Sequence, residues 1–194
     1  MKIVIARYNE NVNWTKQFQN VIIYNKGNRL DNTYNQIYLN NVGREGHTYY
    51  KYISDNYNNL DNYTIFLQGN PFDHSPNIIY NLNKCYQFEN ILHKYDTFNF
   101  RFLSETIRCS TFDIEKRDFP HDCSDIYNTW KRIFGENTKN RECLFGTGAQ
   151  FIVSKETILK KPKFFYDNIV KILEYDIGPK EGYHIERFHK YIFS

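Results

Sequence analysis

The sequence contains few of the residues that cross-link or interrupt a fold. Its 194 residues include 4 Cys, 5 Pro and 9 Gly. The cysteines (Cys85, Cys109, Cys123 and Cys143) form no Cys-x-x-Cys pair, which argues against a structural zinc site. The N-terminus shows no secretion signal, so we expect reduced thiols and a cytoplasmic protein.

The sequence also lacks a long hydrophobic run and a strong charge bias. No stretch of about 18 apolar residues occurs, so we expect no membrane span. The apolar N-terminal residues end at Arg7 without a cleavage-site pattern, which predicts a first strand rather than a signal peptide. The net charge of +3 is spread along the chain, and this weak excess predicts no nucleic-acid partner.

Aromatic residues are abundant, with 17 Tyr and 16 Phe, and 41% of the chain is apolar. This supply is sufficient for a sizeable hydrophobic core. The 24 Asn are scattered among apolar residues and form no low-complexity tract. We find no internal repeat and no linker, and we therefore predict a single domain over residues 1–194.

The first 28 residues carry the best indication of fold class. Residues 2–8 read as a strand that is apolar on both faces, residues 13–19 as a short helix, and residues 20–25 as a second strand closed by Lys26-Gly27-Asn28. This β-α-β order predicts a parallel sheet with right-handed crossovers. We expect an α/β, Rossmann-like fold with a mostly parallel sheet flanked by helices.

Periodicity and helix-breaking residues predict the remaining elements. Strands are expected at residues 63–67, 98–102 and 149–153, and helices at residues 44–58, 77–94, 125–134, 155–160, 163–175 and 183–193. Ser154 is expected to cap the helix that follows it, and Gly135 to end the helix before it. Residues 28–43 are predicted as a long loop, and residues 104–121 as an irregular insertion with some strand.

The strand at residues 63–67 ends abruptly in polar residues. Gln68, Asn70, Asp73 and His74 follow it within seven positions. Ligands of open α/β folds bind at the carboxyl ends of strands, so these residues are candidates for substrate binding. The plain alternative is a turn, in which Asp73 caps the chain and His74 is a partly buried surface residue.

Two further segments place charge at predicted strand or helix ends. Arg7, Asn9 and Glu10 follow the first strand. Arg44 follows Gly43 at a helix N-terminus, where backbone N–H groups favour anions and a guanidinium can bind phosphate through two hydrogen bonds. Either segment can instead be an exposed turn with an ordinary charged residue.

The last two candidate segments lie in the C-terminal part of the chain. Residues 145–154 are rich in small residues before a strand, so a ligand can approach the backbone there, and Gln150 lies among them. Glu186 can act as a general base near Arg187 and Lys190, which can neutralise a leaving diphosphate. The alternative for this helix is an ordinary surface Glu–Lys pair.

These five segments together resemble an uncharacterised domain-of-unknown-function family found in fungi and in large DNA viruses. The motifs are RYNE at residues 7–10, NVGRE at 41–45, FLQGxPFDH at 66–74, GAQFxVS at 148–154 and a final ERxW helix at 186–188. Phe188 stands in place of the aromatic Trp. The resemblance spans nearly the whole chain, and a viral source would place the protein in the host cytoplasm.

A weaker resemblance is to glycosyltransferases with the nucleotide-diphosphosugar transferase (GT-A-like) fold. Residues 148–155 are similar to the SQWFxLxR segment of the branch that makes core-2 and xylosyl linkages, and residues 186–188 to its late acidic-aromatic motif. Gln68-Gly-Asn70 occupies the place of an Asp-x-Asp. The resemblance implies an enzyme that works without a metal cofactor, with Mn²⁺ or Mg²⁺ as the alternative.

This resemblance implies sugar transfer from a nucleotide-diphosphosugar donor to a hydroxyl of a glycan or protein acceptor. Glu186 is then the base, and Arg187 or Lys190 stabilises the departing diphosphate. The residues expected to contact the substrates are Arg7, Asn9, Glu10, Arg44, Gln68, Asn70, Asp73, His74 and Gln150.

Two other classes remain open at this stage. One is a catalytically silent module of the same fold that binds a glycan or a nucleotide. The other is a metal-dependent hydrolase that uses Asp73, His74, His121 and Asp122. A requirement for Mn²⁺ would also draw attention to Asp113 and Glu115, the nearest approach to an Asp-x-Asp pattern.

Overall fold

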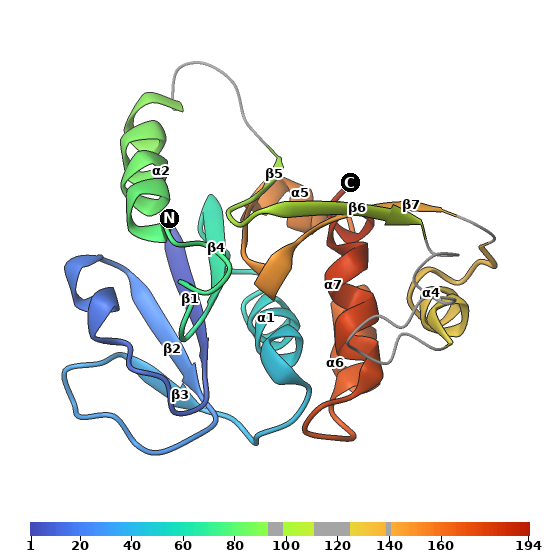
Figure 1. Cartoon of the computed structure of the whole chain (residues 1–194), viewed down its shortest axis with the longest axis horizontal. Helices are drawn as coiled ribbons and strands as arrows, with labels where there is room; N and C mark the ends of the chain where they lie inside the picture. The colour runs from blue at the N-terminus through green and yellow to red at the C-terminus, as the bar shows by residue number, and fades with distance from the viewer. Residues whose placement is uncertain (93–98, 111–124, 139–140) are drawn as a thin grey trace.

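A six-stranded sheet with helices on both faces forms the centre of the protein (Figure 1). The structure is a computed structural model that describes residues 1–92, 99–110, 125–138 and 141–194. The strand order is β3-β2-β1-β4-β8-β5. The strands are β1 (Lys2–Arg7), β2 (Val21–Asn25), β3 (Gln36–Tyr38), β4 (Tyr63–Gln68), β8 (Phe151–Ser154) and β5 (Phe100–Phe102).

Five strands of this sheet run in the same direction, and β8 alone runs against them. β3, β2, β1 and β4 run in the same direction, whereas β8 is antiparallel to both β4 and β5. The prediction of an α/β fold with a mostly parallel sheet is confirmed. The loop predicted at residues 28–43 is wrong in part, because β3 lies within it. Three residues are too few to show a strand period in the sequence.

Side chains alternate along the strands and so supply two separate cores. Val4, Phe66 and Phe151 face one side, where α1 (Arg44–Asp55), α6 (Lys163–Leu173) and α7 (Lys180–Ile192) pack. Ile3, Ile65 and Ile152 face the other side, where η1 (Asn13–Gln17) and α2 (Ile78–Leu92) pack. Figure 1 shows α2 standing apart from α1 and α7, across the sheet.

A second, two-stranded sheet lies beside α7. β6 (Thr106–Ser110) and β7 (Glu142–Gly146) pair antiparallel. The sequence predicted some strand in the first of these segments and none in the second. The remaining helices are α4 (Ile126–Phe134), η2 (Thr147–Ala149) and α5 (Lys155–Leu159). Among the described residues, no helix is long and apolar enough to cross a membrane.

Two predicted helix boundaries are confirmed in atomic detail. The Ser154 hydroxyl accepts the backbone N–H of Thr157 at 3.1 Å and caps α5. Gly135 ends α4 with a left-handed φ of 74°, which a glycine adopts without steric cost.

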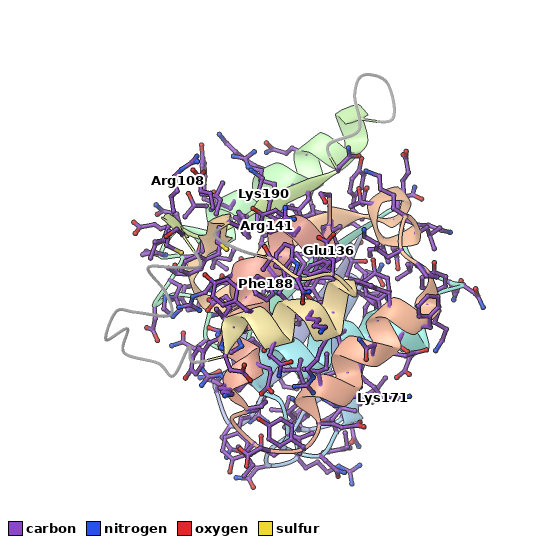
Figure 2. All side chains as sticks on the ribbon, turned by 90° about the vertical axis from the view of Figure 1, so that its right-hand side faces the viewer. Arg108, Glu136, Arg141, Lys171, Phe188 and Lys190 are labelled. Carbon is purple, nitrogen blue, oxygen red and sulfur yellow. The ribbon has the colours of Figure 1, made fainter. Side chains whose placement is uncertain are left out.

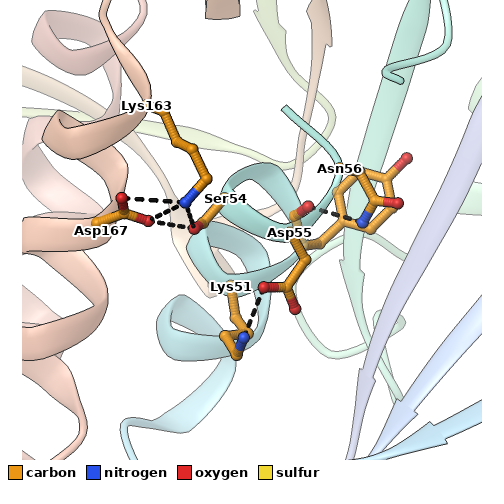
Figure 3. A network of polar contacts seen from close by, with 7 residues as sticks. Lys51, Ser54, Asp55, Asn56, Lys163 and Asp167 are labelled. Atoms are coloured by element: carbon orange, nitrogen blue, oxygen red, sulfur yellow. Dashed lines mark hydrogen bonds and ion pairs between the residues drawn. The ribbon is translucent and has the colours of Figure 1, made fainter. Parts of the chain in front are cut away.

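Polar contacts hold the end of α1 against α6 (Figure 3). The Lys163 ammonium donates to the Asp167 carboxylate at 2.8 Å and to the Ser54 hydroxyl at 3.1 Å. Ser54 also donates to Asp167. Because Ser54 is buried, this network fixes the helix pair that supports the first core.

Replacement of Phe151 tests the first core. Its fully buried ring lies 5.1 Å from Phe66 and 5.8 Å from Tyr49, between centroids. Phe151→Ala should lower the free energy of unfolding by about 4 kcal/mol, through lost transfer energy and the cavity left behind. Phe164→Ala is the matched control: the Phe164 side chain is 72% exposed, so the change should stay within about 0.5 kcal/mol. Urea denaturation measures both, and equal losses would contradict the assignment of the core.

Candidate functional site

The carboxyl ends of the parallel strands open into a cleft of about 710 Å³. The chain runs from β1 to β2 and β3 on one side and returns through α1 to β4 on the other side of β1. Connections that leave in opposite directions create a crevice at the strand ends, which is where open α/β sheets bind ligands. The cleft is lined by Ala6, Arg7, Tyr8, Glu10, Lys26, Asn41, Arg44, Glu45, Gln68, Asn70, Asp73 and Ile177.

Six of the predicted site residues meet in this cleft. They come from the ends of β1 and β4 and from the start of α1: Arg7, Glu10, Arg44, Gln68, Asn70 and Asp73. Asn9 lies beside the cleft, where its side chain accepts the backbone N–H of Asn28 at 2.8 Å. The other predicted residues, His74, Gln150, Glu186, Arg187 and Lys190, do not line it.

Arg7 carries a buried positive charge at the base of the cleft. Its guanidinium donates to the side chain of Asn25 at 2.7 Å and to the backbone carbonyls of Asn28 and Glu10 at 2.8 and 2.9 Å. Within the described part of the chain, no carboxylate lies within ion-pair distance of it. These neutral acceptors orient Arg7 without cancelling its charge, so the cleft receives a positive potential from it.

Lys26 is a cleft residue for which the sequence predicted only a place in the turn that closes a strand. Its ammonium donates to the backbone carbonyl of Val42 at 2.6 Å and also to that of Arg44. Burial lowers the pKa of Lys26 to about 8, and the Glu45 carboxylate partly offsets this. The position directly after β2 is a signal that could have identified it, since the carboxyl ends of parallel strands share one edge.

Arg44 is held in place by both its backbone and its side chain. Gly43 and Arg44 have left-handed φ values of 63° and 51°, a conformation that is costly for arginine. A Cβ on Gly43 would lie 2.5 Å from the Cβ of His47, so only glycine fits there. The Arg44 guanidinium lies 4.5 Å from the centre of the Tyr183 ring and donates to the Tyr183 hydroxyl at 2.5 Å. A strained residue this firmly oriented is typical of a functional site.

Opposite these cations, the segment after β4 supplies amide and carboxylate groups. The Asn70 amide donates to the Asp73 carboxylate at 3.0 Å. The Gln68 side chain makes no hydrogen bond to any residue of the described ranges and has both donor and acceptor atoms to offer a ligand. A Cβ on Gly69 would lie 2.7 Å from the Glu10 carboxylate, so this glycine lets β1 and β4 approach at the cleft.

Glu186 lies behind the wall of the cleft, with a side chain that is 14% exposed. Burial and repulsion from the Glu45 carboxylate raise the pKa of Glu186 to about 7, while Arg187 and the backbone N–H groups of Gly148 and Ala149 oppose the shift. Glu45 lines the cleft. A carboxyl group that changes charge near neutral pH is suited to accept or donate a proton.

The loop that holds Glu186 is itself shaped by His74 and Gln150. Gly148 and Ala149 both have left-handed φ values, 70° and 54°. A Cβ on Gly148 would lie 2.5 Å from Cδ2 of His74, so the imidazole packs directly on this glycine. The buried Gln150 amide donates to the carbonyl of Pro71 at 2.9 Å. In this structure His74 and Gln150 join the segment after β4 to the loop that binds Glu186.

Arg187 and Lys190 are not among the residues that line the cleft. Arg187 is buried against the Phe145 ring, 4.8 Å from its centre, and donates to the carbonyl of Tyr183 at 2.6 Å. Lys190 is exposed, on the face drawn in Figure 2 together with Arg108 and Arg141. Phe188 packs in the core, 5.1 Å from the Trp130 ring.

Within the described ranges, no group of three or more His, Cys, Asp or Glu side chains is placed to hold a metal ion. Two of the residues considered for a hydrolase, His121 and Asp122, lie outside the described residues, as do Asp113 and Glu115.

The fold and the cleft define an α/β protein with a polar, charged cleft at the point where its strand order reverses. Residues 3–194 match the family model described as "Protein of unknown function (DUF3431)", and the chain belongs to this family. The expectation of an uncharacterised domain-of-unknown-function family is thus confirmed. No curated protein and no solved structure matches the chain.

The environment of Glu186 predicts how stability depends on pH. Its folded pKa of about 7 lies above the usual value of 4.5. The folded state therefore binds more protons between these values, and this site loses stability as pH rises through them. Glu186→Gln removes the titration, so the variant should gain about 3 kcal/mol relative to wild type between pH 4 and pH 8.

Chemical denaturation at the two pH values measures this gain. Glu156→Gln is the control, since Glu156 is an exposed carboxylate in the first turn of α5. Its replacement should change the free energy of unfolding by no more than about 1 kcal/mol at either pH value. If the free energy of unfolding of Glu186→Gln changes with pH as that of wild type does, the pKa of Glu186 is not raised in the folded protein.

Proposed function

We propose that this protein is a glycosyltransferase that binds a nucleotide-diphosphosugar in the cleft at the strand ends. We assign the domain to the nucleotide-diphosphosugar transferase (GT-A-like) form of the Rossmann-like fold. One observation carries the proposal: Arg7, Lys26 and Arg44 line one cleft, and a carboxyl group with a pKa of about 7 lies behind its wall. Anion binding and proton transfer are the two tasks that such a reaction sets.

The cations supply the anion site. Lys26 and Arg44 lie where α1 begins, and the positive end of a helix adds to their attraction for phosphate. A planar guanidinium suits two phosphate oxygens, and Arg44 is already oriented by Tyr183. In this proposal these residues, rather than Arg187 and Lys190, stabilise the diphosphate as it departs, and transfer proceeds without an added divalent cation.

The carboxyl groups supply the proton transfer and the contacts to sugar. The Glu186 carboxylate takes the proton of the acceptor hydroxyl while that oxygen bonds to the anomeric carbon of the sugar. The bond from this carbon to the diphosphate oxygen breaks, and the electron pair leaves with the nucleoside diphosphate. Gln68, Asn70 and Asp73 line the same cleft as the cations, and hydroxyl groups of a sugar can bind their side chains.

One observation favours the second candidate, a silent binding module of the same fold. Glu186 is only 14% exposed, and two backbone N–H groups already bind its carboxylate. A base must reach its substrate within about 3 Å, directly or through one water. If the loop at Gly148 keeps the Glu186 carboxylate from reaching the ligand, the cleft binds its ligand without catalysing a reaction.

Titration calorimetry with nucleotide-diphosphosugars, each with and without Mn²⁺, tests donor binding. Lys26→Met and Arg44→Ala should each weaken the binding of the preferred donor by about tenfold, since each removes a charge-assisted contact. Lys51→Ala is the control, because Lys51 lies on the same helix and pairs with Asp55 instead. Its donor affinity should match wild type. No binding by any donor would overturn the proposal.

Turnover then separates the enzyme from the silent module. Glu186→Gln should lower transfer, or hydrolysis of the donor, by at least about a hundredfold, because a positioned base contributes that much. Donor affinity in the variant should stay close to that of wild type. Donor binding without turnover in the wild type would identify the binding module, and full activity of Glu186→Gln would remove Glu186 from the mechanism.

A further inference from the structure

A second cavity, of about 510 Å³, lies on the opposite face of the sheet from α1. It is formed between the start of α2 and the segment from β5 to Glu105. Its floor includes Ile152, a buried member of the second core, and its walls include Phe102 and Leu103. A space of this size with apolar walls is typical of a small-molecule site.

Two cations stand at this apolar cavity. Arg101 faces Ile152 across the β5–β8 ladder, and it is exposed. Among the described residues, no carboxylate lies within ion-pair distance of its guanidinium. The Lys84 ammonium lies 4.6 Å from the centre of the Tyr80 ring. Glu105 is the single carboxylate in the described lining, so positive charge is in excess.

Cys85 adds apolar character rather than charge. Burial raises the pKa of its thiol to about 11, although the nearby Arg101 opposes the shift. The thiol is therefore neutral at physiological pH and behaves as a small hydrophobic group. The cavity thus combines an apolar interior with a guanidinium that forms no ion pair with a carboxylate of the described ranges.

We propose that this second cavity binds a small amphipathic anion, with an apolar body against Ile152 and Leu103 and a carboxylate or phosphate group on Arg101. An apolar body gains free energy by leaving water, and the guanidinium supplies a partner for the acidic group. No residue of the described ranges lines both this cavity and the donor cleft. The two meet at one position in the chain, since Asp73 lines the cleft and His74 lines the cavity.

The fluorescent dye 8-anilinonaphthalene-1-sulfonate is the probe, because it is an apolar ring system with one anionic group. The folded protein should bind one dye molecule with a saturable rise in fluorescence. Arg101→Gln should weaken this binding by about fivefold, as expected for an exposed charge pair. Asn77→Trp, a change of an exposed residue at the cavity, should block it.

Two control variants test whether dye binding depends on this cavity rather than on other cationic residues or on the donor cleft. Arg108→Gln removes an exposed arginine of β6 (Arg108 is labelled in Figure 2) that pairs with Glu142, and it should leave the dye affinity unchanged. Lys26→Met should also leave it unchanged, so the cleft and the cavity are tested separately. Dye binding that does not saturate, or that is equally strong in Arg101→Gln and Arg108→Gln, would overturn the proposal.

Discussion

The reversal of strand order at β1 is the constraint on which the site depends. Parallel strands need crossover connections: the chain leaves β1 for β2 and β3 on one side, and α1 then carries it from β3 to β4 on the other side of β1. All of their carboxyl ends then open at one edge, with no connection across the gap between β1 and β4. Gly69 allows the close approach of Glu10 at this gap. Residues more than sixty positions apart therefore line one cleft.

The charged groups in this cleft and behind it lower the stability of the folded protein. Glu45 and Glu186 repel each other, and Arg44 and Ala149 occupy left-handed backbone conformations. Nearby, burial lowers the pKa of His47 to about 4, and Lys26 and Lys51 add to the effect. The aromatic core around Phe151 supplies the stability that offsets these costs. Strain concentrated at one end of a well-packed sheet is the pattern expected of a functional site.

The sequence predicts features that depend on local chemistry. The cap at Ser154 and the helix end at Gly135 follow from neighbouring residues alone. The grouping of Arg7, Arg44 and Gln68 follows from one rule about strand ends. Lys26 was not predicted as a site residue, because lysine is common in turns. Only the strand order shows that this turn lies beside α1. The burial of Arg187 could not be predicted either, since it depends on β7, a strand with no clear period in the sequence.

The segment from Asn70 to His74 forms the boundary between the two cavities. Asn70 and Asp73 are hydrogen-bonded to each other, Gln150 holds Pro71, and His74 packs on Gly148. The segment is therefore joined to the loop that binds Glu186 as well as to both cavities. If binding on one side moved this segment and thereby changed affinity on the other side, thermodynamic linkage would require the effect to be equal in both directions. The contacts of His74 with Gly148 thus connect the cleft, the second cavity and the proposed base in one structural unit.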